Sequence, residues 1–294
     1  MQRRAFLQTA AASTVILAHR SALAADRKPI EFVVVTDTHL GYQGKDAALT
    51  RWQQTAAAVE KSPGDFVLHL GDIVDRGVDE LYPKYLDIRR QIRKPVQEIP
   101  GNHDPAETFQ KHIRQTVDLA FTHDWLRVVL LNNSSPDSHD GFLTEKQLTW
   151  LADQAEAAVK GEQQLLFCMH VPVHKNLHPD RGWYVKPAHG QQQFYDLMKQ
   201  YERNTLAVFH GHFHNGLRGW QDHGPLHEVC FPSALYNKSR NLEAQQAPGY
   251  NPPEFRPGFT QVKITAREIQ IRLQTLDEAD ALKKDLALGE MVSG

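Results

Sequence analysis

The sequence contains few cysteines, with only Cys168 and Cys230 in 294 residues. Both lie in apolar, strand-like stretches. In an oxidising compartment they could form a disulfide. Nothing in their spacing requires pairing, however, so two buried free thiols are the preferred interpretation.

The chain also lacks an excess of basic residues. It has 33 Lys and Arg against 35 Asp and Glu, a formal net charge of −2. The first 24 residues carry three arginines and no acidic residue, so without them the balance is 30 against 35 and the net charge is −5. This composition gives no indication of a surface that binds nucleic-acid polymers or anionic membranes.

The apolar stretch near the N-terminus, Ala10–Ala18, is too short to span a bilayer as a helix. It follows Arg3 and Arg4 and precedes a small-residue ending within Met1–Ala24. This order is typical of a twin-arginine signal peptide that the export machinery recognises and that is cleaved near its end. The mature protein is then expected in the periplasm or outside the cell, without a stable membrane anchor. The alternative is a disordered basic N-terminus.

Residues 25–294 contain no Ser/Gly-rich linker and no internal repeat, which predicts a single domain. A helix is predicted over 144–160, where Thr144 and Gln147 have the spacing of a capping box. Weaker helical patterns cover 46–60 and 80–93.

The C-terminal part alternates between polar and apolar residues. Phe259–Leu276 does so in two runs on either side of Ala266–Glu268, which predicts a β-hairpin. The polar tail from Asp277 onward is interpreted as a loosely docked helix.

Five short apolar runs each end beside residues that could bind a metal ion. They are Ile30–Thr36 before Asp37 and His39, Asp65–Leu70 before Asp72, Val96–Ile99 before Asn102 and His103, Leu165–Met169 before His170, and Leu206–Phe209 before His212 and His214. Their length, composition and flanking Gly or Pro favour buried strands. Because ligands gather beyond the carboxyl ends of strands in α/β sheets, the five ends are expected to converge on one site.

Seven of these side chains offer carboxylate, amide or imidazole donors and no thiolate: Asp37, His39, Asp72, Asn102, His170, His212 and His214. Such donors suit Mn, Fe, Zn or Co rather than a cysteine-rich zinc centre. Seven ligands are too many for one open catalytic ion. If Asp72 bridges, each of two ions receives four protein ligands and keeps an open position. Two divalent or trivalent transition-metal ions are therefore the expected cofactors.

The motifs D-x-H, G-D-x-x-D, G-N-H-D, H and G-H-x-H follow one another between Asp37 and His214, so the chain resembles the calcineurin-like metallophosphoesterases. The resemblance implies an α/β (α+β) fold, a four-layer α-β-β-α sandwich of two mixed sheets. It implies one metal site of Asp37, His39, Asp72 and His214, and another of Asp72, Asn102, His170 and His212. It also implies that His103 is the acid near the leaving group.

The segment Gly141–Leu151 narrows the resemblance to one branch of the family, which contains cyclic-nucleotide phosphodiesterases, glycerophosphodiesterases and purple acid phosphatases. Asp75 stands where purple acid phosphatases have a metal-binding tyrosine, which argues against an iron-tyrosinate centre. The motif GDIVDRG is similar to that of Ser/Thr protein phosphatases, but the presence of GNHD and GHFH argues against that class. Arg76, in the same motif, either contacts a phosphate or is a surface arginine.

The expected reaction is hydrolysis of a small phosphoric ester at a dinuclear centre. Two ions lower the pKa of a bridging water, so that hydroxide attacks phosphorus in line. His103, supported by Asp104, then protonates the leaving group. A phosphodiester such as a cyclic nucleotide is favoured, because only Arg76 lies within a motif to clamp the extra charge of a monoester. Alternatives are a phosphomonoesterase, a nucleotide pyrophosphatase and, disfavoured by the intact motifs, a non-catalytic metal-binding scaffold.

The segment Lys175–His189 is predicted to be a loop over the metal site. In it, Trp183 or Tyr184 either stacks on a base or sugar or packs on the body of the protein. His174 and His178 could line the pocket. Seven other histidines are expected to be structural or exposed: His69, His112, His123, His139, His210, His223 and His227.

Overall fold

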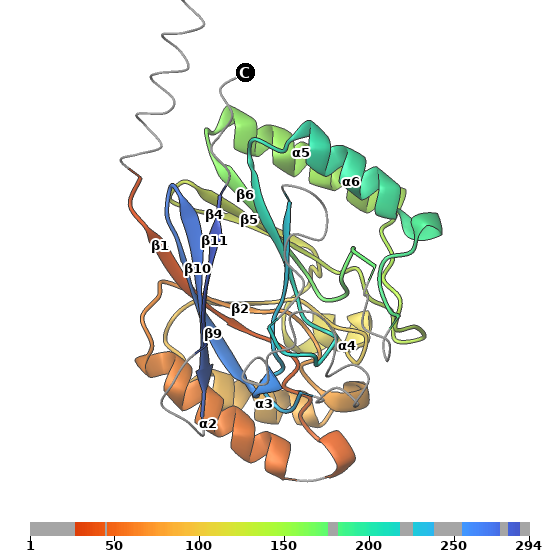
Figure 1. Cartoon of the computed structure of the whole chain (residues 1–294). Coiled ribbons are helices and arrows are strands. Elements are labelled where there is room, and N and C mark those ends of the chain that lie inside the picture. Colours follow the sequence, from red (N-terminus) through yellow and green to blue (C-terminus); the bar gives the residue numbers. More distant parts are fainter. Residues whose placement is uncertain are drawn as a thin grey trace, which may run out of the picture.

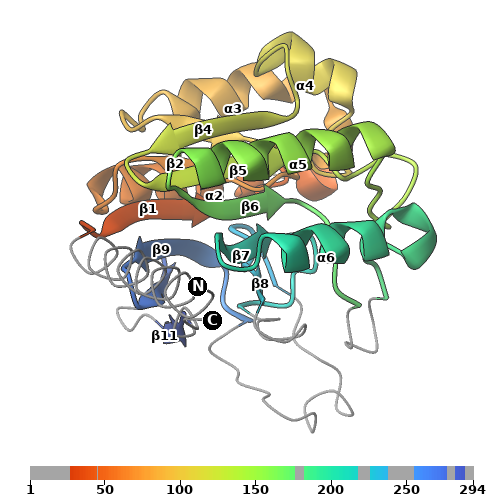
Figure 2. The same ribbon diagram turned by 90° about the horizontal axis from the view of Figure 1, so that it is seen from above.

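The computed structural model describes residues 27–44, 46–175, 182–217, 226–237, 255–276 and 282–288. The predicted signal peptide lies outside these residues. Two mixed β-sheets face each other, and helices cover their outer faces (Figures 1 and 2). The predicted four-layer sandwich is therefore confirmed.

The first sheet has the strand order β11-β10-β9-β1-β2-β3. Its strands are β1 (Ile30–Val35), β2 (Val67–His69), β3 (Val96–Glu98), β9 (Gly258–Ile264), β10 (Glu268–Thr275) and β11 (Leu282–Ala287). β1, β2 and β3 run parallel, whereas β9 pairs with β1 in the antiparallel direction. The carboxyl ends of β1, β2 and β3 therefore lie at the same edge of this sheet.

The second sheet has the order β4-β5-β6-β7-β8. Its strands are β4 (Leu119–His123), β5 (Leu126–Leu131), β6 (Gln164–Met169), β7 (Thr205–His210) and β8 (His227–Cys230). All pairs from β5 to β8 are parallel, and only β4 is antiparallel. This sheet therefore also presents a row of carboxyl ends, including those of β6 and β7.

Helices α2 (Ala47–Lys61) and α3 (Leu81–Arg89) cover the first sheet, and α5 (Glu145–Lys160) and α6 (Gln191–Gln200) cover the second (Figure 1). The short helix α4 (Ala106–His112) follows β3. Single 3-10 turns lie at Tyr42–Gly44, Asp75–Gly77 and Pro187–His189.

Three apolar layers hold the sandwich together. The central layer lies between the sheets and includes Phe32, Leu130 and Phe209. Each of the other two joins a sheet to its helices, with Trp52 in the first and Phe194 in the second. Side chains therefore pack on both faces of the central strands, which explains why those strands appear in the sequence as continuous apolar runs.

The predicted elements agree with the structure except at the C-terminus. The three predicted helices correspond to α2, α3 and α5, and Thr144 and Gln147 form the expected reciprocal capping box of α5. The hairpin is present as β9 and β10. The predicted helix after Asp277 is wrong, because residues 282–287 form β11, an edge strand paired with β10.

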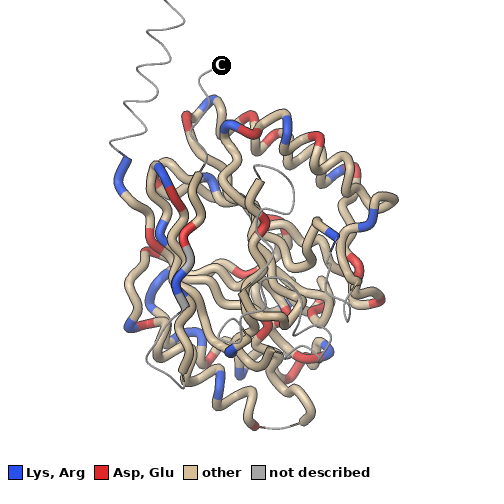
Figure 3. The backbone as a smooth tube through the Cα atoms, viewed as in Figure 1, with Lys and Arg blue, Asp and Glu red and all other residues tan. Residues whose placement is uncertain are grey.

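Acidic and basic residues are interspersed along the described backbone (Figure 3). Of the helices that the structure describes, none combines the length and the apolar composition that a membrane crossing requires.

Candidate metal centre

The residues that follow β1, β2, β6 and β7 are joined to one another by hydrogen bonds. The Asp37 N–H donates to the Gly71 carbonyl at 2.9 Å, and the His39 N–H donates to the Asp72 carbonyl at 3.0 Å. Across the two sheets, the His212 N–H donates to Oδ2 of Asp37 at 3.1 Å. The carboxyl ends of strands from both sheets thus meet in one place, as the sequence predicts.

Five of the seven predicted ligands have a left-handed backbone conformation. Their φ angles are 55° at Asp37, 41° at His39, 52° at Asp72, 74° at His212 and 49° at His214. Non-glycine residues rarely adopt such angles, and each costs of order 1 to 3 kcal/mol. Strain of this kind persists only where the surrounding structure requires it, and it gathers at functional sites.

Two glycines of the motifs allow the backbone to approach the site closely. Gly71 has a φ of 95°, and a Cβ there would lie 2.7 Å from Nδ1 of His170. A Cβ on Gly101 would collide with Oδ1 and the backbone nitrogen of Asp72. The space beside Asp72 and His170 therefore requires glycine at both positions.

The first ligand group consists of Asp37, His39, Asp72 and His214, whose donor atoms all lie within 4.8 Å of one another. Nε2 of His214 lies 3.0 Å from Oδ1 of Asp37 and 3.0 Å from Nε2 of His39. Nδ1 of His214 bonds the Tyr236 carbonyl at 2.8 Å, which directs Nε2 into the group. All four residues are buried.

The second group contains Asp72, His170 and His212. Nδ1 of His170 bonds the Leu70 carbonyl at 2.7 Å, so the neutral imidazole has its lone pair on Nε2. That atom lies 3.2 Å from Nδ1 of His212. Oδ1 of Asn102 is buried without a hydrogen-bond partner, while the amide nitrogen lies 3.4 Å from Nδ1 of His139.

Asp72 belongs to both groups. Its Oδ2 lies 3.3 Å from Nε2 of His39 and 3.3 Å from Nε2 of His170. Its Oδ1 accepts the His103 backbone N–H at 2.9 Å. This is the position that a bridging carboxylate requires.

The chemistry of the donors fits two metal ions. Oδ1 of Asp37 and Oδ1 of Asn102 are both buried without a hydrogen-bond partner. Buried polar atoms are otherwise nearly always paired, so metal ions explain both oxygens. Imidazole nitrogens that face each other at 3.0 and 3.2 Å have the separation of ligands that share one ion.

Electrostatics keeps the Asp72 carboxylate ionised. Burial alone would raise the pKa of Asp72, but the nearby His170 and His39 hold it well below its usual range. Conversely, burial lowers the pKa of the two histidines, and the carboxylates outweigh it. The pKa of His39 rises to about 10 and that of His170 to about 9.

Asp75, and not Asp104, is the carboxylate that contacts His103. Oδ1 of Asp75 lies 3.0 Å from Nδ1 of His103 and 3.5 Å from Nδ1 of His39. The Arg76 backbone N–H also lies 3.3 Å from Nδ1 of His103. The shorter contact to a carboxylate favours a proton on Nδ1, which leaves Nε2 of His103 to exchange a proton.

The expected support of His103 by Asp104 is therefore corrected. Asp104 is buried, and its carboxylate accepts the N–H groups of Ile73, Val74 and Gly101 together with the Tyr82 hydroxyl. These bonds tie the loop after β2 to the loop after β3. Asp104 thus shapes the turn that carries His103.

Arg76 is a surface residue, because its side chain is 86% exposed and its nearest acidic partner is Asp75 at 3.8 Å. This favours a surface arginine over a residue that contacts a phosphate.

A pocket of about 380 Å³ opens beside the second ligand group. Its lining includes Asn102, Asp137, His139, Asp140 and Trp183. The rings of His139 and Trp183 stack with centroids 4.1 Å apart, and Trp183 lies 5.3 Å from the ring of His212. Trp183 therefore packs on the body of the protein, which is one of the two interpretations considered from the sequence, and it also lines the pocket.

Sequence reasoning assigned no role in the site to His139. This residue lies in the loop after β5, the strand beside β6. Because β5 is also a parallel apolar strand, the rule that ligands lie beyond strand ends would have indicated this loop.

Tyr184 is the other aromatic residue considered from the sequence. Nζ of Lys186 lies over its ring, 3.7 Å from the centroid.

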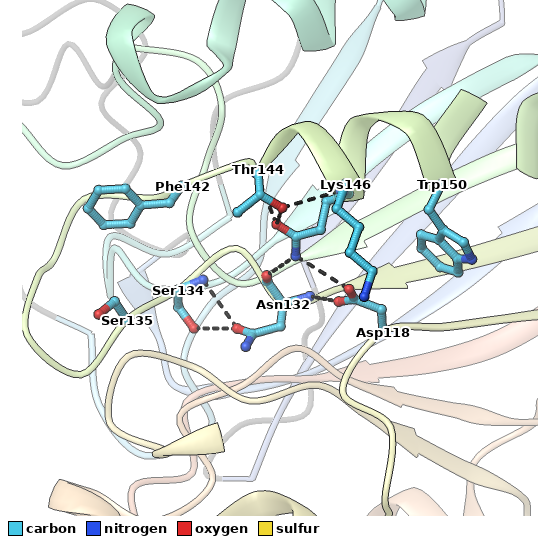
Figure 4. Close-up of a pocket in the computed structure, with 9 residues that line it drawn as sticks. Asp118, Asn132, Ser134, Ser135, Phe142, Thr144, Lys146 and Trp150 are labelled. Atoms are coloured by element: carbon cyan, nitrogen blue, oxygen red, sulfur yellow. Dashed lines mark hydrogen bonds between the residues drawn. The ribbon is translucent and has the colours of Figure 1, made fainter. Parts of the chain in front are cut away.

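A larger pocket, of about 570 Å³, lies at the start of α5 (Figure 4). None of the seven candidate ligands lines it. Its polar groups bond one another: Oδ1 of Asp118 accepts the Asn132 N–H at 2.7 Å, and Oδ1 of Asn132 accepts the Ser134 hydroxyl at 3.0 Å. The smaller pocket, which includes the candidate metal ligand Asn102, is therefore the better candidate for a substrate site.

Most other predictions for single residues agree with the structure. Cys168 and Cys230 are buried free thiols. His69 is buried between Trp52 and Tyr85. His178 and His223 lie outside the described residues.

Comparison with known proteins agrees with this geometry. A family model described as calcineurin-like phosphoesterase matches residues 30–216. A probable glycerophosphodiester phosphodiesterase of Arcobacter nitrofigilis is 29% identical over 62% of this chain and 71% of its own. A probable cyclic nucleotide phosphodiesterase of Rhodopseudomonas palustris is 26% identical over 82% of this chain and 91% of its own.

Solved structures share the fold at low sequence identity. A dimetal phosphatase from Danio rerio has a TM-score of 0.64 at 13% identity, covering 87% of this chain and 99% of its own. A purple acid phosphatase from yellow lupin has a TM-score of 0.68 at 12% identity, covering 90% of this chain and 54% of its own.

The first prediction concerns the shared carboxylate. Asp72→Ala should lower the metal content by two ions per chain and abolish turnover, because both ligand groups lose a member. His39→Ala should lose at most one ion. Metal analysis of both purified variants tests this, and equal metal contents in the two variants would argue against the bridge.

The second prediction concerns pH. In the metal-free protein His39 and His170 hold protons at neutral pH, since their pKa values are raised to about 10 and about 9. Metal ions must displace those protons, so the apparent affinity should increase as the pH rises through 9 and level off above 10. Titrations of chelator-stripped protein across this range measure it. An affinity that stays constant between pH 7 and 9 would contradict the assignment.

Proposed function

The chain belongs to the calcineurin-like phosphoesterase family of metal-dependent hydrolases, and we propose that it hydrolyses small phosphodiesters at a dinuclear centre bridged by Asp72. The observation that carries this proposal is the position of Asp72 between two buried ligand groups, beside a pocket that reaches Asn102. Manganese, iron, zinc and cobalt all suit the donors.

The protein supplies ligands, orientation and a proton. Asp37, His39 and His214 would hold one ion and Asn102, His170 and His212 the other, with Asp72 common to both. When bound, such a pair supplies Lewis acidity toward the phosphoryl oxygens and toward an attacking water. His103 lies beside the first group, with its ring 4.6 Å from that of His39.

His103 is suited to protonate the leaving group. Its Nδ1 is held by Asp75, which leaves Nε2 to donate. An alkoxide leaves poorly without a proton, and a positioned acid contributes roughly 100- to 10,000-fold. Once Nε2 has given up its proton, His103 is neutral and keeps the contact of Nδ1 with Asp75.

The charge of the pocket favours a diester monoanion over a monoester dianion. Among the described residues that line it, Asp137 and Asp140 are acidic and none is Lys or Arg. Asp140 is paired with Lys186 at 3.1 Å, whereas Asp137 is exposed. A second negative charge on the substrate would therefore meet repulsion, and Arg76 points into solvent.

The stacked His139 and Trp183 give the pocket an aromatic wall that suits the second ester group of a diester, such as a nucleoside. The names of the two relatives, for a glycerophosphodiester and for cyclic nucleotides, support this substrate class. A phosphomonoesterase and a nucleotide pyrophosphatase are the competing activities, and the acidic lining disfavours the first.

We also propose that the protein is exported through the twin-arginine pathway to the periplasm or beyond. Arg3 and Arg4 followed by a short apolar stretch support this route.

The third prediction tests the proton donor. His103→Ala should keep its metal ions but lose roughly 100- to 10,000-fold in kcat on alkyl phosphodiesters. On nitrophenyl esters the loss should be far smaller, because nitrophenolate leaves without a proton. Equal losses on both substrates would instead point to a role in positioning.

A matched pair of carboxylate variants extends this test. Asp75→Asn should show the same preferential loss on alkyl esters, because Asp75 orients His103. Asp79→Asn removes the same charge nearby, but Asp79 pairs with Lys111 and His112 at the surface. It should leave both activities unchanged.

The fourth prediction tests the substrate class. Steady-state kcat/KM should be higher for an aryl diester than for the matched aryl monoester by roughly fivefold, since a like-charge contact with the exposed Asp137 costs about 1 kcal/mol in water. Asp137→Asn should raise kcat/KM for the monoester more than for the diester, because the monoester carries the larger negative charge. Asp153→Asn, on the exposed side of α5, is the control of equal charge. A monoester preferred by the unmodified enzyme over every diester would refute the proposed substrate class.

The fifth prediction tests export. Replacing Arg3 and Arg4 by Lys should leave uncleaved precursor inside the cell, because a receptor recognises the arginine pair. Arg20→Lys, in the same segment, should be processed normally. Recovery of the double Lys variant from the periplasm at normal levels would exclude this route.

A further inference from the structure

A second group of metal-binding side chains lies away from the dinuclear centre. It consists of His174, His210 and Glu228, and we refer to it as the β6–β8 cluster. His174 follows β6, His210 ends β7 and Glu228 lies in β8. All three residues are buried, and their donor atoms lie within 4.8 Å of one another. None of the seven ligands of the dinuclear centre belongs to it.

The β6–β8 cluster lies on the face of the second sheet that α6 covers. Glu228 is in register with Val208, which packs in the apolar layer between this sheet and the helices. The hydroxyl of Tyr195, in α6, donates to Oε1 of Glu228 at 2.5 Å. The cluster is thus enclosed between β7, β8 and α6.

The carboxylate of Glu228 is held in one orientation. Its Oε2 lies 3.1 Å from the His174 backbone N–H and 3.0 Å from Nδ1 of His174. The His174 backbone N–H at Oε2 and the Tyr195 hydroxyl at Oε1 hold both oxygens of a side chain that is 0% exposed. Such contacts orient a metal-binding carboxylate in many sites.

His210 is the unusual member. Its side chain is 0% exposed, and neither ring nitrogen has a hydrogen-bond partner. An imidazole offers two polar nitrogens, and burying both without partners is costly. In native proteins such an orphan usually marks a water or an ion at the site. Because a nitrogen of His174 and a carboxylate oxygen of Glu228 lie within 4.8 Å of a ring nitrogen of His210, a cation fits better than a water.

We propose that His174, His210 and Glu228 bind a third metal ion, a divalent transition metal of the zinc type, separate from the pair at Asp72. Two imidazoles and one carboxylate are donors that suit Zn²⁺ and its neighbours. The separation of 3.0 Å between Nδ1 of His174 and Oε2 of Glu228 is that of two ligands on one ion. The ion also neutralises a buried carboxylate.

A role for this ion follows from the chain. His174 lies four residues after His170, and His210 lies two residues before His212. An ion in the β6–β8 cluster would join the ends of β6 and β7, and these ends carry two ligands of the dinuclear centre. The third ion therefore stabilises the protein and positions catalytic ligands without touching substrate.

Metal counting in the full chain tests the proposal. Chelator-stripped protein reloaded with Zn²⁺ should bind three ions per chain, and Glu228→Gln should bind two. Asp72→Ala should retain one ion, and Asp72→Ala/Glu228→Gln none. The comparison of Asp72→Ala with Asp72→Ala/Glu228→Gln does not depend on the phosphodiesterase proposal. Both variants lack the dinuclear centre, so any ion that differs between them belongs to the β6–β8 cluster.

Two further variants guard against indirect effects. His210→Phe fills the same space without nitrogens and should also lose one ion. His227→Gln, a buried histidine that bonds the Ala287 carbonyl beside Glu228, should retain three ions. Adding Zn²⁺ should raise the melting temperature of Asp72→Ala and should leave that of Asp72→Ala/Glu228→Gln unchanged.

Two results would overturn the third site. One is a wild-type protein that saturates at two ions. The other is an ion in Asp72→Ala that survives Glu228→Gln. If the Glu228→Gln or His210→Phe protein fails to fold, Co²⁺ absorption of Asp72→Ala decides instead. A visible band of a histidine-ligated ion supports the site, and its absence at saturating Co²⁺ contradicts it.

Discussion

The rest of the site depends on one buried carboxylate between two imidazoles. Oδ2 of Asp72 faces Nε2 of His39 and of His170 at equal distances of 3.3 Å. To place it there, strands of both sheets must end at the same point and their loops must bond across the gap. The need to bring these loops together also explains the left-handed conformations of five candidate ligands and the requirement for glycine at position 101. The backbone strain at these residues persists because the packing of the three apolar layers in the sandwich stabilises the fold around them.

Much of this arrangement could be predicted because it is local in the sequence. Each ligand directly follows an apolar run, and parallel strands bring their carboxyl ends together whatever their exact pairing. The capping box at Thr144 depends on three-residue spacing and was equally visible. The strand β11 in the C-terminal tail could not be predicted in this way. Leu282 and Leu286 are four residues apart, and this spacing places two residues on one face of either a helix or a strand. Backbone pairing with β10 decides in favour of the strand.

The contacts that sequence reasoning missed are those between loops. Asp104 is adjacent to His103 in the chain, but its oxygens are taken by backbone N–H groups, and Asp75 reaches His103 from the preceding loop. His139 reaches Asn102 from a loop with no motif of its own. In the same way, the members of the β6–β8 cluster come from three separate elements, so no short motif contains them. Such contacts depend on side-chain directions that spacing alone does not specify.

The central claim is that two ions share Asp72, and anomalous diffraction from crystals of the metal-loaded protein tests it most directly. At the ends of β1, β2, β6 and β7, the account predicts two anomalous peaks roughly 3.5 to 4 Å apart, with the Asp72 carboxylate between them. A single peak there at full metal loading, or two peaks of which only one lies against Asp72, would contradict it.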